Sequence, residues 1–468
     1  MTRATRSGVF YDIARGVCPT CYRRCDGVIE IHGNDVWLIL RCPEHGEHRG
    51  LLADDADYWR NAREQWLKPP ELPHKFASEV RWGCPWDCGL CTDHRQHSCL
   101  TLIEINEACN LTCPVCFANS GTHRTTHRPL AEVEAMLDAA VAAEGEPDVV
   151  QISGGEPTLH PQLFEILDAA RQRPIRHLMI NTNSLRIASE EGFAERLAGY
   201  MPGFEVYLQC DSLRDDRLMV LRGARLADVH ERALERLEAA GVSTTLVATI
   251  AEGVNDDEIG DLVSYALRWS CVRGVTLQPV QRAGRVPKEE GGRPIPLTGV
   301  RRRLLEQHDL FEPEDVVPVP CHPSALAMAY ALRTPDGGAV PLTGLLDRER
   351  LIDAAGNTIA FERLPEAREA VAGAFSAALS PASRADRLGR LLCCLPALDA
   401  PDLTYRDVFR VLIVRFADAW DLELRSLKQS CIAFAQPDGR MIPFETYNLF
   451  YRQGLTDRLV QGRADARR

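Results

Sequence analysis

The chain has 468 residues, enough for two or three domains with a sizeable hydrophobic core. With 45% hydrophobic and 26% charged residues, its composition is that of an ordinary globular protein and excludes wholesale disorder. The formal net charge is −12, which disfavours a broad nucleic-acid interface because such an interface needs a basic face. We therefore expect no nucleic-acid partner.

Seventeen cysteines would suit a disulfide framework only in a small secreted domain. The first residues are polar and lead into mixed sequence without a secretory apolar segment. No run approaches the roughly 18 apolar residues of a membrane-spanning helix. We expect a cytoplasmic protein whose thiols are kept reduced for metals. Eleven of the cysteines lie in the first 116 residues, so metal chemistry is concentrated there.

The first group of cysteines combines a CxxC and a CxxH motif. The intervening residues 28–40 read as two short strands about a Gly-Asn-Asp turn, which predicts a mononuclear metal site with a closed tetrahedral shell. Cys25 or His48 could replace one of the ligands, and the metal could be zinc or a rubredoxin-like iron. The ligands that we assign are Cys18, Cys21, Cys42 and His45.

The second group follows a predicted helix over residues 54–70 and has CxxxCxxC spacing with a further cysteine eight positions on. Four thiols within sixteen residues can ligate one [4Fe–4S] cluster completely, so we interpret this segment as a closed auxiliary cluster. A zinc site of four thiols is the alternative. The ligands assigned here are Cys84, Cys88, Cys91 and Cys99.

The third group, Cys109, Cys113 and Cys116, repeats the CxxxCxxC spacing directly after an apolar run at 100–105 that predicts a buried strand. Three thiolates on one loop can hold three irons of a [4Fe–4S] cluster. The fourth iron then lacks a protein ligand from this motif, which leaves a position where a small molecule can bind.

From residue 100 onward the pattern is regular α/β. Alternation of strands with helices predicts parallel βα units, with polar residues at the carboxyl ends of strands where such barrels carry their chemistry. The predicted strands cover residues 100–105, 149–153, 177–182, 204–209, 243–250 and 274–278. The predicted helices cover residues 130–144, 161–173, 190–198, 226–240 and 257–269.

A CxxxCxxC loop after the first strand, followed by Gly-Gly-Glu-Pro after the second, resembles the radical SAM superfamily. Its members fold as a partial (β/α)6 barrel and bind S-adenosylmethionine at the open iron of a [4Fe–4S] cluster. The resemblance implies that Cys109, Cys113 and Cys116 ligate the cluster. The two glycines would let the backbone approach the ligand closely. The residues expected to bind S-adenosylmethionine are Gly154, Gly155, Glu156, Pro157, Phe117, Asn183 and Asp211.

Several of these positions have an alternative structural interpretation. Asn183 and Asp211, like the neighbouring candidate Asn181, could equally form an Asx turn or a helix cap. Val115 would join Phe117 against the adenine, and Gln278 ends the last predicted strand. The chemistry implied by the resemblance is reductive cleavage of S-adenosylmethionine to a 5′-deoxyadenosyl radical, with ferredoxin or flavodoxin as electron donor.

The flanking segments resemble more closely the archaeal tetraether lipid synthase and class D radical SAM methyltransferase group. The resemblance rests on residues 83–99, on the N-terminal metal motif and on residues 431–444. It implies C–C bond formation or alkylation at unactivated carbon of a lipid-like substrate, with peripheral membrane contact, or alternatively methyl transfer to a pterin-like ring. The alternative that is not an enzyme is an iron–sulfur electron carrier.

The same resemblance implies a third cluster in the C-terminal half, although Ser324 and Glu445 occupy positions where further cysteines would be expected. The available thiols are Cys321, Cys393, Cys394 and Cys431. We expect a metal-binding N-terminal unit at 1–60, an auxiliary-cluster segment at 61–99, a radical SAM core at 100–290 and a mainly helical C-terminal cap at 291–468. Within the cap, residues 405–427 read as an amphipathic or buried helix.

Overall fold

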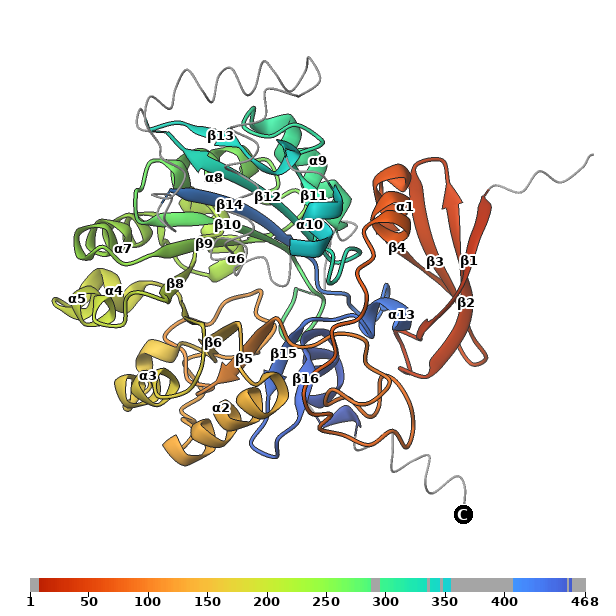
Figure 1. Ribbon diagram of the computed structural model, residues 1–468, viewed down its shortest axis with the longest axis horizontal. Helices are drawn as coiled ribbons and strands as arrows, with labels where there is room; N and C mark the ends of the chain where they lie inside the picture. Colours follow the sequence, from red (N-terminus) through yellow and green to blue (C-terminus); the bar gives the residue numbers. More distant parts are fainter. Residues whose placement is uncertain are drawn as a thin grey trace, which may run out of the picture.

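The computed structural model describes residues 8–287, 295–334, 337–345, 348–354, 407–452 and 454–456. Figure 1 shows a small N-terminal sheet beside a larger α/β body that contains a long, strongly curved sheet. The two cysteines at 393 and 394 lie outside the described residues. In the part of the chain that is described, no helix combines the length and the apolar character needed to cross a bilayer.

The N-terminal unit is an antiparallel sheet of four strands in the order β1-β2-β3-β4. The predicted hairpin is confirmed as β2 (Arg24–His32) and β3 (Asp35–Cys42), which pair across a turn in which Gly33 has a φ of 64°. Two outer strands were not predicted, because their charged residues obscure the alternation: β1 (Val9–Val17) and β4 (Gly46–Ala53). The predicted helix follows as α1 (Ala56–Gln65).

The α/β core has the predicted strand order. Six consecutive strands pair in parallel, so that their carboxyl ends meet at one edge of the sheet. These strands are β5 (Leu100–Glu104), β6 (Val149–Ser153), β7 (His177–Thr182), β8 (Phe204–Gln209), β9 (Thr244–Ile250) and β10 (Val272–Pro279). The connecting helices are α2 (Leu130–Glu144), α3 (Leu163–Arg171), α4 (Leu185–Ser189), α5 (Phe193–Ala198), α6 (Asp215–Arg222), α7 (Ala227–Ala240) and α8 (Ile259–Leu267).

The C-terminal region is not mainly helical where it is described. The prediction of a helix over 405–427 is wrong, because its apolar run forms the strand β14 (Val408–Val414). A short continuous apolar run cannot be assigned to a buried strand or a buried helix by periodicity alone. The other strands here are β11 (Val317–Pro318), β12 (Leu326–Arg333), β13 (Ala339–Pro341), β15 (Ile432–Ala435) and β16 (Met441–Pro443). The helices include α9 (Leu297–Gln307), α10 (Arg348–Ala354), α13 (Leu424–Leu427) and α14 (Phe444–Thr446).

These late strands extend the barrel sheet at both of its ends. β14 pairs in parallel with β10 at one end, and β15 pairs in parallel with β5 at the other (Figure 1). In the second pairing Ile432 lies opposite Leu100, so the residues just before these two strands, Cys431 and Cys99, are brought side by side. The C-terminal region therefore supplies part of the barrel wall.

A buried ion network ties β14 to the barrel. The Arg410 guanidinium donates to Glu205 Oε1 at 2.7 Å, and the other carboxylate oxygen lies 3.1 Å from His177 Nε2. Glu205 has no exposed surface. Burial by itself would raise the pKa of Glu205, but Arg410 and His177 together lower it below its usual range.

We predict that Glu205→Gln lowers the free energy of unfolding by about 3 kcal/mol, because it leaves the Arg410 charge buried without its counter-charge. The midpoint of urea unfolding, followed by circular dichroism under anaerobic conditions, measures the effect. The exposed Glu195 provides a matched control, since Glu195→Gln should leave the midpoint unchanged. Equal midpoints for the two variants would contradict the assigned role of the ion pair.

Candidate active site

The N-terminal sheet brings together the four ligands predicted for the mononuclear metal site. Their ligand atoms lie within 4.8 Å of one another, with the Cys21 and Cys42 sulfurs 3.7 Å apart and Cys42 Sγ 3.5 Å from His45 Nδ1. A tetrahedral site with metal–sulfur bonds of about 2.3 Å requires sulfurs about 3.8 Å apart, so this group fits a single ion. Although burial opposes it, hydrogen bonds from backbone amides and from His45 lower the pKa of Cys42 to about 6.

Neither alternative ligand belongs to this group of atoms. The Cys25 thiol instead donates to the Arg23 carbonyl at 3.4 Å. His48 Nε2, on β4, lies 3.3 Å from the carbonyl of Val17 at the end of β1. Both side chains are thus occupied by the backbone of the sheet that frames the metal site.

The loop after β5 presents its three cysteines to a cavity at the carboxyl ends of the strands. Cys109, Cys113 and Cys116 all line this cavity, whose empty space is about 950 Å³. Burial raises the pKa of the Cys109 thiol to about 12, so a metal bound here must displace a proton. Three convergent thiols with room beside them fit a [4Fe–4S] cluster that has one open iron.

Arg285, which follows β10, holds the cysteine loop in place. Its backbone exchanges two hydrogen bonds with Cys116, at 2.8 and 2.9 Å. Its guanidinium donates to the Cys113 carbonyl at 2.5 Å and to the Ser120 carbonyl at 2.7 Å. The two ends of the parallel strand series are therefore joined across the mouth of the barrel.

The two glycines after β6 are required by the cysteine loop itself. A Cβ on Gly155 would lie 2.3 Å from the Ala108 carbonyl oxygen, and one on Gly154 would lie 2.4 Å from Asn106 Oδ1. Gly154 also has a φ of 145°, which disfavours other residues. From the sequence, these glycines were expected to let the backbone approach a ligand. The structure shows that they are also needed for the loops after β5 and β6 to pack together.

Glu156 fastens this turn to the next strand end. Its carboxylate accepts hydrogen bonds from the Thr158 hydroxyl, the Thr182 hydroxyl and the Asn183 amide at 2.6, 2.8 and 2.7 Å. The side chain is only 1% exposed, and burial raises its pKa. The Glu156 carboxylate, which was expected to bind S-adenosylmethionine, is thus engaged within the protein. Pro157 begins the short 3-10 helix η1 (Pro157–Leu159).

Asn183 both forms an Asx turn and lines the cavity. Its Oδ1 accepts from the Leu185 backbone amide at 3.2 Å at the start of α4, while its Nδ2 donates to Asn110 Oδ1 at 2.6 Å. Asn110 belongs to the cysteine loop, and Asn183 lines the cavity. The Asx turn and the binding interpretation are therefore compatible at this position.

Asp211 does not line the cavity, contrary to its expected role. Its carboxylate is 1% exposed, accepts from the Thr249 backbone amide at 2.7 Å and pairs with the Arg222 guanidinium, which donates to Oδ1 at 2.8 Å. Arg222 is the residue that reaches the cavity beside Cys113. The sequence did not identify Arg222 as a cavity residue, because it lies on the short helix α6, which was not predicted, and because it belongs to no motif.

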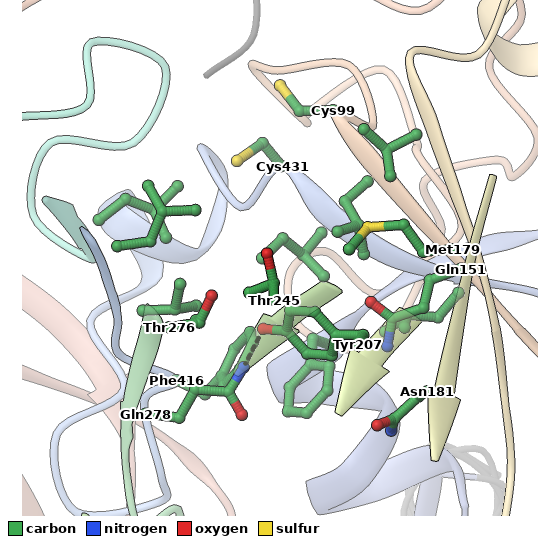
Figure 2. A pocket seen from close by; sticks show the side chains of 18 of the residues that line it. Cys99, Gln151, Met179, Asn181, Tyr207, Thr245, Thr276, Gln278, Phe416 and Cys431 are labelled. Atoms are coloured by element: carbon green, nitrogen blue, oxygen red, sulfur yellow. Dashed lines mark hydrogen bonds between the residues drawn. The ribbon is translucent and has the colours of Figure 1, made fainter. Parts of the chain in front are cut away.

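A second cavity fills the barrel interior and adjoins the first. Its empty space is about 1010 Å³, and six residues line both cavities, including the aromatic side chains Phe117, Phe416 and Phe444. Phe416 stacks on Phe444 with ring centroids 3.6 Å apart. Figure 2 shows polar side chains that point into this space from several strands. Those labelled there are Gln151, Asn181, Tyr207, Thr245, Thr276 and Gln278.

A sequence signal for this interior did exist. In the apolar strands β8 and β10, polar residues recur at alternate positions, as in the pairs Tyr207 and Gln209 or Thr276 and Gln278. Alternate residues of a strand face the same side, so these polar positions predict a shared polar lumen. Only Asn181 and Gln278 had been singled out, from their places at strand ends.

The assignment of Cys99 to the second cysteine group is corrected by the structure. Cys99 lies instead with Cys321 and Cys431, all three sulfurs being within 4.8 Å of one another. The cause is the pairing of β15 with β5, which sequence spacing cannot reveal. The Cys321 and Cys431 sulfurs are 3.7 Å apart, and hydrogen bonds from these two residues hold the pKa of Cys99 well below its usual range.

The remaining three cysteines of the second group stay on their own loop. Asp87 organises this loop by accepting hydrogen bonds from the backbone amides of Trp82 and Gly83 at 2.5 and 2.7 Å. The Tyr451 hydroxyl accepts from the Cys88 amide at 2.9 Å. Burial raises the pKa of Cys88 to about 12. The three thiols, on Cys84, Cys88 and Cys91, repeat the spacing of the cavity loop without a fourth cysteine from this segment.

Two family models match parts of this chain. Residues 103–266 match the radical SAM superfamily, and residues 10–54 match the HMPTM N-terminal zinc ribbon domain. The 7,8-dihydro-6-hydroxymethylpterin dimethyltransferase of Methanocaldococcus jannaschii is 27% identical over 94% of both chains. The GTP 3′,8-cyclase of Alkaliphilus metalliredigens is 29% identical over 39% of this chain and 57% of its own length. SuiB of Streptococcus suis aligns over 46% of each chain with 19% identity and a TM-score of 0.39.

The chain is therefore a radical SAM enzyme with an N-terminal zinc ribbon. Its cofactors are the [4Fe–4S] cluster and the S-adenosylmethionine of that superfamily, besides the metal site of the ribbon.

We predict that Gly155→Ala displaces the cysteine loop, since its Cβ would meet the Ala108 carbonyl at 2.3 Å. Iron and sulfide per chain after anaerobic reconstitution should fall, with loss of 5′-deoxyadenosine formation. Gly199→Ala is the control, because a Cβ there meets only the Arg196 carbonyl, at 3.2 Å, in a helical conformation. Full iron content in Gly155→Ala would refute the packing role of this glycine.

Substitutions in the two CxxxCxxC loops should have different effects on S-adenosylmethionine. Cys113→Ala should remove the iron of one cluster and abolish cleavage of S-adenosylmethionine, whereas Cys88→Ala should leave S-adenosylmethionine binding intact. Iron analysis, electron paramagnetic resonance and the yield of 5′-deoxyadenosine report on the two variants. Normal 5′-deoxyadenosine formation by reconstituted Cys113→Ala would falsify the ligand assignment.

Proposed function

We propose that this radical SAM enzyme transfers a one-carbon unit to a ring carbon of a pterin-type heterocycle. Of the two reactions expected from the sequence, the likeness over 94% of both chains to a pterin dimethyltransferase favours this one over alkylation of a lipid. Bound S-adenosylmethionine and the reduced cluster together supply a radical that can abstract hydrogen from an unactivated carbon.

The observation that carries the proposal is the continuity of the two cavities. The interior cavity shares Asn181, Gln209 and Gln278, besides the aromatic side chains, with the cavity that holds the cysteine loop. A planar heterocycle can stack on Phe444 and Phe416 while its edge meets amides and hydroxyls. A substrate in the interior would therefore lie directly beside the site of radical formation.

The protein's own residues have distinct tasks in this arrangement. Arg285 and the two glycines at 154 and 155 keep the cysteine loop against the strand ends. Arg222, whose charge is paired with Asp211, lines the cavity beside Cys113, where its guanidinium can still donate a hydrogen bond to the carboxylate of S-adenosylmethionine. Phe117 covers the junction of the two cavities and helps to exclude water from the reacting atoms.

We also propose that Cys99, Cys321 and Cys431 hold an auxiliary metal centre at the opposite end of the barrel. Cys99 precedes β5 and the cysteine loop follows it, so the two centres are separated by a five-residue strand, about 16 Å at 3.3 Å per residue. All three thiols of the group border the interior cavity. The loop with Cys84, Cys88 and Cys91 is proposed to hold a further cluster.

The decisive experiment for the reaction compares pterin pools by mass spectrometry. A host that makes dihydropterins expresses either the wild-type chain or Cys113→Ala. We expect pterins heavier by one or two methylene units only with the wild-type chain. Unchanged pterins together with newly joined lipid tails would overturn the pterin proposal and restore the lipid reaction.

The auxiliary centre has its own test. We expect Cys431→Ala to lose metal relative to the wild-type protein while the ribbon metal and the cavity cluster are retained. Cys271 is a buried thiol outside every cysteine group, so Cys271→Ala should keep the full metal content. Metal analysis and Mössbauer spectroscopy distinguish zinc, mononuclear iron and cluster iron. Equal metal content in the two variants would rule out a centre at Cys431.

A further inference from the structure

The polar groups that line the interior cavity are almost all neutral. Amides and hydroxyls project from β6 to β10, and among the described lining residues Arg410 alone carries a cationic side chain. That charge is already engaged by Glu205 at 2.7 Å and by the Thr245 hydroxyl at 3.0 Å. The cavity therefore offers hydrogen bonds without an available counter-charge for an anionic ligand.

Two of the amides have their orientation set by neighbours. Arginine has only donors, so the contact of Arg222 with Gln209 Oε1 at 2.8 Å identifies that atom as the amide oxygen. Gln209 Nε2 then donates to Asn181 Oδ1 at 2.8 Å. This chain of hydrogen bonds leaves Asn181 Nδ2 as a donor that has no protein acceptor within the described residues.

On the facing strand the polarity is reversed. Gln278 Nε2 donates to the Tyr207 hydroxyl at 3.0 Å, as the dashed line in Figure 2 shows. The carbonyl oxygen Oε1 of Gln278 is consequently left as an acceptor at the boundary of the two cavities. A ligand spanning the lumen thus meets a donor on β7 and an acceptor on β10.

Gln151, on β6, differs from the other amides of the cavity because its side chain has no hydrogen-bond partner among the described residues. Its side chain is buried, with 4% exposed, and lines the interior cavity. Its amide makes no hydrogen bond with any other part of the chain that the structure describes. Neither amide atom is sealed inside the protein, because both face the cavity, so this position can offer a donor and an acceptor to a bound group.

We propose that Gln151, Asn181 and Gln278 bind the hydrogen-bonding edge of an uncharged planar heterocycle and exclude its anionic derivatives. This inference rests on the proposed function and specifies how the substrate would be recognised. An amide array distinguishes rings by their pattern of donors and acceptors, and losing one contact leaves a buried polar group unpaired. A phosphate or diphosphate ester would have to enter the lumen without a free cation to meet it.

The test is equilibrium binding of 7,8-dihydro-6-hydroxymethylpterin to the anaerobic protein reconstituted with its clusters, followed by pterin fluorescence. We expect Gln151→Met and Gln278→Met each to weaken binding at least tenfold. Gln151 lies outside the cavity of the cysteine loop, so Gln151→Met should also leave the affinity for S-adenosylmethionine unchanged. Methionine keeps the volume and removes only the hydrogen-bonding groups. The exposed Gln162 is the matched control, and Gln162→Met should bind as the wild type does.

A second arm of the experiment uses the diphosphate ester of the same pterin and also guanine, an uncharged bicyclic ring with a comparable edge. The wild-type protein should bind the diphosphate at least tenfold more weakly than the free alcohol. Equal affinity for the two would overturn the exclusion of anions. Wild-type affinity in both Gln151→Met and Gln278→Met would overturn the amide array, whether or not pterins are methylated.

The same data separate this inference from the proposed reaction. Binding of guanine but not of the pterin, lost in the methionine variants, would support the amide array and contradict the pterin substrate. Failure of the wild-type protein to bind either ring would overturn both. Thermal unfolding of each variant confirms that weaker binding reflects the missing amide and not a loss of folded protein.

Discussion

The pairing of two late strands with the ends of the parallel sheet is the constraint on which the rest of the structure depends. β15 lies beside β5, with Ile432 opposite Leu100, and β14 lies beside β10, with Arg410 opposite Gly274. Segments that are distant in the sequence therefore form one continuous hydrogen-bonded wall. This pairing places Cys431 next to Cys99 and Arg410 next to Glu205. Without it the lumen would lack a side, and the three-cysteine group would not assemble.

The direction of the strands then separates the two ends of the barrel. Loops at the carboxyl ends hold the cavity cysteines, while the cysteines that precede β5 and β15 gather at the amino ends. Between them the alternation of side chains along each strand lines the lumen with amides and hydroxyls. The substrate chamber is therefore a consequence of strand polarity and strand period, with the aromatic side chains of Phe416 and Phe444 covering one wall.

Close packing of loops is as important to this site as the identity of the ligands. The loops after β5 and β6 meet so tightly that Gly155 has no room for a side chain, and Glu156 uses its carboxylate to join the turn to β7. Arg285 completes the arrangement from the far end of the strand series. These contacts position the cavity cysteines on a rigid frame, which a radical reaction needs in order to exclude water.

The sequence by itself predicted what depends on local spacing. Three features could be recognised because each is encoded within a few residues. They are the CxxxCxxC loops, the ribbon ligands Cys18, Cys21, Cys42 and His45, and the alternation of strands and helices between residues 100 and 279. What only the tertiary structure decided depends on contacts between distant segments. Cys99 lies with Cys321 and Cys431, and not with the cysteines nearest to it in the sequence. Residues 408–414 form the strand β14 and not a helix, and Arg222 lines the cavity where Asp211 was expected. These three features follow from strand pairing and burial, which leave no signature in local sequence.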